Sequence, residues 1–132
     1  MSADRSILSQ IQGIIVAANP DIPVKYVGRI LPVPDDQKYI ELVWLPTNGN
    51  FFWNGQNNDT GAFRIILHWP NDDQGAYGPM DYMEQNILPL FPKGTLANGL
   101  QLLMEPNFNG PLEMGKETLY PWTIRYQRYN RG

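Results

Sequence analysis

The chain contains no cysteine. Disulfide bridges, thiolate nucleophiles and cysteine-based metal sites are therefore excluded. It has a single histidine, His68, and none of the HExxH, GxSxG or glycine-rich phosphate-binding motifs that carry common chemistries. Because His68 lies within an apolar, strand-like segment, a structural role is favoured over a catalytic one. We expect no enzymatic activity, no cofactor and no bound metal.

The chain also lacks an excess of basic charge and any long apolar run. Ten Lys and Arg residues stand against thirteen Asp and Glu, so the net charge is -3 and a basic surface for nucleic acid is not expected. We interpret Arg125, Arg128 and Arg131 as a solvated strand end. No segment approaches the length of a membrane span, and the N-terminal segment lacks the features of a secretory signal. We expect no membrane partner and a cytoplasmic origin.

The composition that remains is that of one globular domain, residues 1–132. Hydrophobic residues make up 42% of the 132, and a chain of this length is able to bury a substantial core. Trp and Tyr are numerous and Lys is sparse. This balance is typical of the centres of protein interfaces, and equally of aromatic-rich strands.

Hydrophobic periodicity predicts a helix over 3–18, because apolar residues recur there at helical spacing and Asn19-Pro20 follows. A second helix is predicted over 78–94, with Pro89 ending or kinking it. The segment 21–37 is predicted to be loop-like, with a short strand at most.

The predicted strands cover 38–45, 61–69, 119–129 and, more weakly, 99–106. Pro121 indicates that the last strand begins at an edge or a bulge. The order of elements predicts an α+β fold, in which a mostly antiparallel sheet has two helices packed against it.

Two polar loops, 46–62 and 70–79, are longer than their connections require, and long loops are commonly functional. Three aromatic residues in the first loop, Phe51, Phe52 and Trp53, can be interpreted in two ways. They either continue the sheet and cover the end of the core, or they form a surface for a partner, with Trp53 as anchor and 56–60 as polar rim. The candidate interface residues are Phe51, Phe52, Trp53, Asn57, Asp59, Asp72, Asp73 and Tyr77.

Other kinds of site receive less support. Asn71, Asp72 and Asp73 are similar to a fragment of a calcium loop, but the rest of that pattern is missing and an Asx turn is favoured. Trp44, Trp53 and Trp69 could form a sugar-stacking platform, so a small carbohydrate- or ligand-binding module is one alternative. A hydrolase that uses carboxylates is another.

The order and local texture of the segments resemble a known family over nearly the full length. A helix and the approach DIPVKYVGRILP lead to the strand YIELVWLP. A long loop and TGAFRIILHWP follow, then YMEQNILPLFPKGT, and the chain closes with an aromatic strand, LYPWTIRYQRY. This pattern is similar to the tail terminator, or tail-completion, proteins of long-tailed bacteriophages, the group that includes protein U of phage lambda. It is especially similar to a branch labelled only as a phage-related domain of unknown function.

The resemblance implies a structural virion protein of the tail and neck, assembled in the host cytoplasm. Its members form a homo-hexameric ring that caps the tail tube, ends its polymerisation and joins the tail to the head connector. The implied partners are other copies of the chain, the tail tube protein and a head-completion protein. DNA would pass through the lumen without specific binding, which an acidic chain suits. A head-closure or other neck protein remains the alternative.

Overall fold

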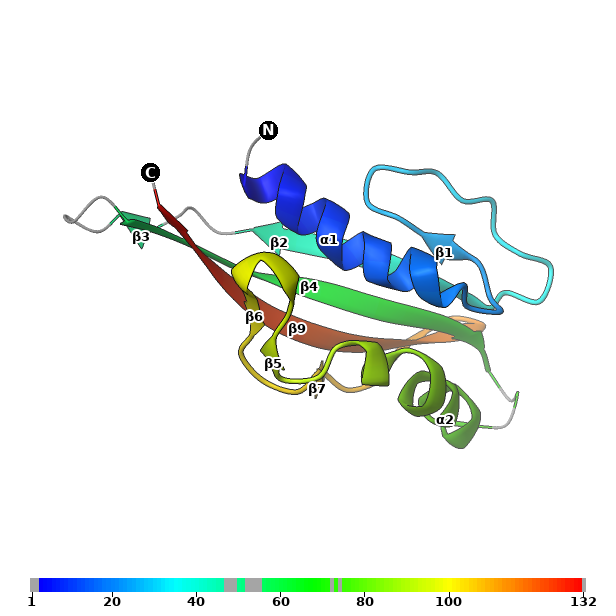
Figure 1. Ribbon diagram of the computed structural model, residues 1–132. Coiled ribbons are helices and arrows are strands. Elements are labelled where there is room, and N and C mark those ends of the chain that lie inside the picture. The colour runs from blue at the N-terminus through cyan, green and yellow to red at the C-terminus, as the bar shows by residue number, and fades with distance from the viewer. Residues whose placement is uncertain (1–2, 47–49, 52–55, 72, 74, 132) are drawn as a thin grey trace.

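The computed structural model describes residues 3–46, 50–51, 56–71, 73 and 75–131. Within these residues the fold is α+β, with two α-helices and one nine-stranded sheet (Figure 1). The helices are α1 (Ala3–Ala18) and α2 (Tyr77–Asn86), and 3₁₀ turns cover Leu88–Leu90 and Ala97–Gly99. The strands are β1 (Val24–Lys25), β2 (Tyr39–Pro46), β3 (Asn50–Phe51), β4 (Gln56–Pro70), β5 (Gly94–Thr95), β6 (Leu100–Leu102), β7 (Asn107–Phe108), β8 (Leu112–Met114) and β9 (Glu117–Arg131).

The sheet is built around β4 and β9, which pair antiparallel along their full length of 15 residues each. The strand order is β1-β2-β4-β9-β6-β5, while β3 pairs with β4, and β7 and β8 pair with β9. Only the β1–β2 pair is parallel in the described sheet. The predicted mostly antiparallel sheet is therefore confirmed.

Helix α1 has the predicted bounds and lies on the sheet through one apolar stripe. Ile7, Ile11 and Ile15 recur every four residues, and all three are fully buried. Burying each such side chain contributes about 1.5–3 kcal/mol. The helix ends where Asn19 adopts a left-handed φ of 49°, a conformation that asparagine tolerates at a helix C-terminus.

The second predicted helix is shorter than expected. Helix α2 ends at Asn86, and Pro89 lies in the 3₁₀ turn that follows, so the break at this proline is confirmed. The predicted stop at Lys93-Gly94 is wrong, because Gly94 already begins β5. Met83, Ile87 and Phe91 are nevertheless fully buried in the common core.

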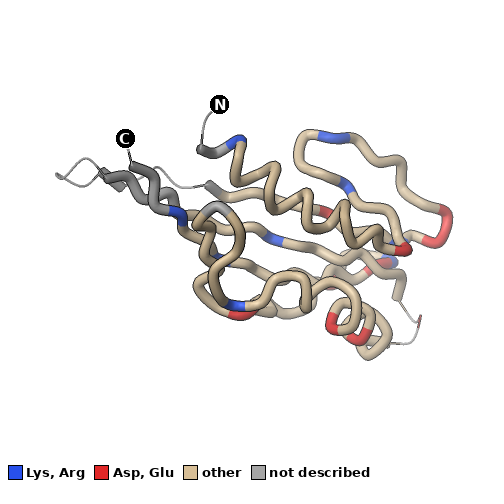
Figure 2. The backbone as a smooth tube through the Cα atoms, in the orientation of Figure 1, with Lys and Arg blue, Asp and Glu red and all other residues tan. Residues whose placement is uncertain are grey.

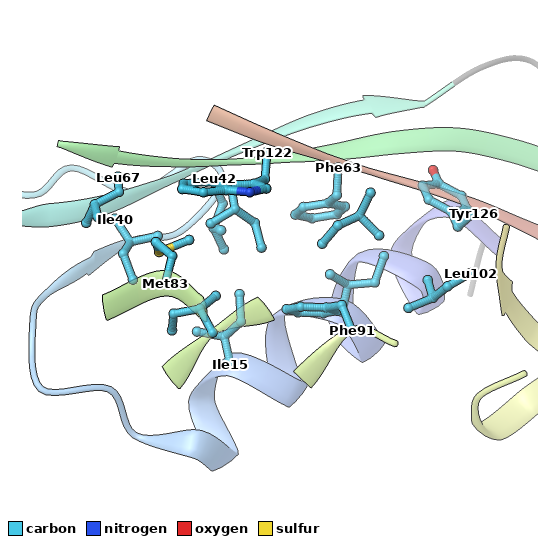
Figure 3. Close-up of a cluster of buried hydrophobic side chains, with 14 of the residues drawn as sticks. Ile15, Ile40, Leu42, Phe63, Leu67, Met83, Phe91, Leu102, Trp122 and Tyr126 are labelled. Atoms are coloured by element: carbon cyan, nitrogen blue, oxygen red, sulfur yellow. The ribbon is translucent and has the colours of Figure 1, made fainter. Parts of the chain in front are cut away.

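Both helices pack on the same side of the sheet, which is here called the covered face (Figure 3). Side chains alternate between the two faces of a strand, and the register of β2, β4 and β9 brings one set from each strand together. The buried side chains of the covered face are Ile40, Leu42, Phe63, Ile65, Leu67, Trp69, Tyr120, Trp122, Ile124 and Tyr126. Neither helix has the length and apolar character that a membrane-spanning helix requires, within the residues described.

Strand β4 begins earlier than predicted. Gln56–Thr60 was expected to be a polar loop, yet its backbone pairs with residues 127–131 of β9 and continues the ladder. Because this segment is polar, its own sequence did not indicate a strand. The pairing with β9 decides its conformation, so the long first loop is shorter than expected.

Pro121 lies in the interior of the sheet, and of the two predicted alternatives, an edge or a bulge, the structure shows the bulge. It pairs with Ile66 of β4 on one side. On the other side its carbonyl accepts a hydrogen bond from Asn109 N, between the short strands β7 and β8. Three residues there, 109–111, lie opposite two of β9, so the ladder is bulged where proline has no N–H to donate.

Candidate interaction surface

The second side of the sheet, here called the open face, carries neither helix in the described chain. It is made by the side chains of Tyr39, Glu41, Val43, Leu45, Ala62, Arg64, Ile66, His68, Glu117, Leu119, Pro121, Thr123 and Arg125. Val43, Ile66 and Leu119 are only half-buried, and Leu45 is 42% exposed.

Strand β8 extends this apolar surface. Leu112 and Met114 pair with Leu119 and Glu117, so they share their face, and both are exposed. The open face therefore runs from β2 across the whole sheet to β8 as an apolar surface with charged residues interspersed.

An open hollow of about 360 Å³ lies in this face. Its walls include Leu45 from the end of β2, Leu103 from the segment after β6, and the two cationic side chains Arg64 and Arg125. Thr123 lies in the floor and donates a 2.6 Å hydrogen bond from its hydroxyl to Asn109 Oδ1. Strands from three parts of the chain thus build one site with apolar walls and positive charge.

The two arginines of the hollow are diagonal neighbours on adjacent strands. Arg64 is paired with Thr123, and Arg125 with Ala62, which places the arginine Cα atoms about 7–8 Å apart. Among the described residues, neither guanidinium forms an ion pair or hydrogen bond, and Arg64 Nε is buried without an acceptor. An oxyanion supplied from outside would satisfy these donors and relieve the repulsion between the two charges.

His68 forms a second polar cluster on the open face. The ring is buried between two carboxylates, with Nε2 2.9 Å from Glu41 Oε1 and Nδ1 3.2 Å from Glu117 Oε1. It stacks on Tyr39 at 4.0 Å between ring centroids. Burial, and then the charges of Glu117 and Glu41, raise the pKa of the Tyr39 hydroxyl. The cluster ties β2, β4 and β9 together, which is the structural role expected for this histidine.

Replacing His68 with alanine is expected to lower the free energy of unfolding by about 1–3 kcal/mol, because the ring's polar contacts with Glu41 and Glu117 and its stacking on Tyr39 are lost from a buried site. The measurement is urea unfolding followed by circular dichroism. His68→Gln, which keeps an amide able to reach one carboxylate, should lose less. An alanine variant as stable as the parent chain would contradict the structural role.

The structure separates the predicted interface residues into two groups. Asn57 and Asp59 lie near the start of β4, whereas Asp73 and Tyr77 follow its end. At about 3.3 Å per residue, the two groups are on the order of 35 Å apart, so they do not form one patch. Phe51 is placed in β3 beside the start of β4, and its backbone pairs with Asn57. Phe52, Trp53 and Asp72 lie outside the described residues.

The second group has one residue with an internal role and one that faces solvent. Asp73 forms an ion pair with Lys38 at 2.7 Å, and its carbonyl accepts a hydrogen bond from Trp69 Nε1. The Lys38 ammonium also lies 4.3 Å from the centre of the Trp69 ring. Asp73 thus holds the end of β4 in place. Tyr77 begins α2 and is 83% exposed, as a contact residue would be.

Two further sequence interpretations change. Arg128 is not in a solvated strand end: it is 7% exposed, and its Nη1 donates to Ser6 Oγ of α1. Trp44 packs on the core with Nε1 bonded to Tyr126, and Trp69 is buried. Two of the three tryptophans proposed as a sugar-stacking platform are therefore core residues. Among the described side chains, no group of acidic or histidine residues is placed to hold a metal ion.

The sequence did not lead us to predict the open face, although the pattern of apolar residues in β2 and β4 indicates it. In ELVWL and RIILHW, apolar residues occupy both alternating phases of the strand. A strand of this kind is typical of a sheet covered on both faces. The two helices cover only one face, so the apolar residues of the second phase, such as Val43, Leu45 and Ile66, are left without a helix over them within the described chain.

Comparison with known proteins supports the fold and leaves the role open. No family model and no curated protein matches the chain. A solved structure is similar to 89% of this chain and 94% of its own, with a TM-score of 0.61 and 15% sequence identity. The name of that protein states no activity or partner. At this identity the likeness shows a shared α+β fold alone.

Proposed function

We propose that this protein is a self-assembling structural subunit, and specifically a tail terminator of a long-tailed phage that forms a homo-hexameric ring. The observation that carries the proposal is the open face. Its strands carry apolar residues such as Val43, Leu45 and Ile66 among polar ones, and neither helix of the described chain covers them. Burial of the second phase by another copy gives these strands the cover that their sequence favours.

The order of elements gives the proposal its particular form. A first helix, the paired strands β2 and β4, a second helix and the aromatic last strand β9 follow one another, which is the order on which the resemblance to the tail terminator family rests. In that role the ring caps the tail tube, ends tube polymerisation and presents its other side to the head-completion protein. The partners are then copies of the chain, the tail tube and the connector. DNA passes through the lumen without specific binding, and the chain acts in the virion rather than as an enzyme.

Ring formation is tested by light scattering over a concentration series, with negative-stain images of each species. We expect a species of six times the 15.1 kDa chain mass, with six-fold symmetry in the images. If the free protein is monomeric, the proposed terminator function requires it to bind the ends of isolated tail tubes. A monomer that leaves tubes unbound would contradict the proposal. Binding to connectors and not to tubes would identify a head-closure protein instead.

A further inference from the structure

The segment between β1 and β2, residues 27–38, is here called the arm, and it exposes two large apolar side chains. Ile30 is 95% exposed and Val33 is 64% exposed. Among the described residues, none forms a hydrogen bond with residues 30–33. The arm thus presents two exposed apolar side chains within four residues, and it lies in the half of the molecule away from the C-terminus (Figure 1).

The shape of the arm is set by its prolines. Pro32 and Pro34 fix their own φ angles, and each restricts the residue before it to extended conformations. A segment held in this way loses little conformational entropy when it docks, as in other proline-containing recognition segments. The conformation of the arm is therefore restricted before it binds. Its exposed side chains are not covered by the rest of the described chain.

The arm ends in two exposed carboxylates, Asp35 and Asp36, which form the acidic tip of this loop (Figure 2). Asp36 Oδ1 accepts a hydrogen bond from the backbone N of Lys38, which leaves its other oxygen available. Arg29, at the opposite end of the arm, is exposed as well. In chain order, the arm presents two apolar side chains followed by two negative charges.

The hollow of the open face has complementary chemistry. Leu45 and Leu103, about 40% exposed, supply apolar walls. Arg64 and Arg125 supply positive charge that no described carboxylate neutralises. The hollow lacks acidic residues, and the arm has an acidic end.

The arm does not reach the hollow of its own chain. It joins β2 at Tyr39, whereas Leu45 lies six residues further along that straight strand, about 20 Å away. The arm also leaves the sheet beyond β2, next to the edge strand β1. Because Ile30 and Val33 are exposed in the folded chain, a contact between arm and hollow would join two copies.

We propose that the arm of one copy docks in the hollow of the next, which deepens the ring-forming role proposed above and rests on it. Ile30 and Val33 contact the apolar walls, while the two aspartates meet Arg64 and Arg125. Because the two patches differ, every copy uses both, and repetition of the contact gives a closed ring or an open chain. Bidentate pairing with arginine would fix the register of the arm.

Cysteine cross-linking tests the contact directly, since the natural chain has no cysteine to compete. One preparation carries Val33→Cys, the other carries Leu103→Cys, and the two are mixed with a short bis-maleimide. We expect roughly tenfold more heterodimer than from Val16→Cys mixed with Leu103→Cys, because docking raises the local concentration of the thiols. Val16 is a matched control, being an exposed apolar residue on α1.

Charge reversal then tests the ionic part of the contact. Asp35→Arg with Asp36→Arg should lower the cross-linking yield about tenfold, because like charges would meet at the arginines. Arg64→Asp with Arg125→Asp in the partner preparation should restore the yield. Asp81→Arg with Glu84→Arg on α2 changes the net charge equally and should leave the yield unchanged, since both residues are exposed away from the arm.

The outcomes separate the contact from the proposed function. Rings without preferential cross-linking would overturn the arm contact and leave the ring-forming role. Preferential cross-linking in a species that stays an open chain or a dimer would support the contact and oppose the hexameric ring. The absence of both rings and preferential cross-linking would overturn the contact. An unchanged yield after charge reversal would refute the arginine–aspartate pairing.

Discussion

Replacement of Phe63 with alanine is expected to lower the free energy of unfolding by about 3–5 kcal/mol. Phe63 is fully buried at the middle of the covered face (Figure 3). It lies between Trp44 of β2 and Ile124 of β9 in the three central strands, on the face against which the helices pack. Its removal leaves a cavity where three strands meet, and domains of this size have only about 5–15 kcal/mol of stability in total. The measurement is urea unfolding followed by circular dichroism and tryptophan fluorescence.

The matched control is Ile66→Ala, on the same strand but on the open face. Ile66 is half-buried, so we expect a loss of about 1 kcal/mol or less in the monomer. The same variant should weaken self-association in light scattering, because the open face is the surface proposed to be buried on assembly. Equal destabilisation by the two substitutions would contradict a core confined to one face.

The centres of the main elements could be predicted from the sequence because local patterns determine them. The first helix follows from isoleucines at every fourth position and from Asn19-Pro20 after it. The middle parts of β4 and β9 follow from alternation. In each of these elements the residues that become buried recur at regular spacing within one segment. The element can therefore be predicted without knowing which other segment it pairs with.

The strand ends and the candidate site could not be predicted in this way, because they depend on partners distant in sequence. Gln56–Thr60 is polar and becomes strand only through its pairing with β9. The hollow combines Leu45, Arg64 and Leu103 with Arg125, and only the register of the sheet brings them together. The arm was predicted to be loop-like, which is correct, yet its exposure and its distance from the hollow depend on the complete fold.

Substitution of Gly61 with alanine is expected to lower the free energy of unfolding by about 1–3 kcal/mol. A Cβ atom at Gly61 would lie 2.5 Å from Tyr126 Oη, 2.8 Å from Tyr126 Cζ and 3.0 Å from the Leu45 carbonyl oxygen. The tyrosine cannot withdraw easily, because it is 1% exposed and accepts a hydrogen bond from Trp44 Nε1. The glycine thus provides room for a buried ring to cross the strand, and its φ angle is not left-handed.

Gly13→Ala is the matched control for this substitution. Gly13 lies in the exposed part of α1, and a Cβ there would meet no atom within 4 Å. Alanine should therefore raise the stability by about 0.5–1 kcal/mol, through its higher helix propensity. The two changes, chemically identical, should shift the urea midpoint in opposite directions.

Tyr126→Phe shows whether the tyrosine hydroxyl is the cause of the expected loss at Gly61. It removes the nearest oxygen, so Gly61→Ala should be less costly in the Tyr126→Phe variant than in the parent chain, with a coupling of about 0.5–3 kcal/mol. Additive effects of the two substitutions would mean that the strain arises at the atoms that the phenylalanine variant keeps, the ring carbon Cζ and the Leu45 carbonyl oxygen. The Tyr126 hydroxyl would then not be the group that requires a glycine at this position of β4.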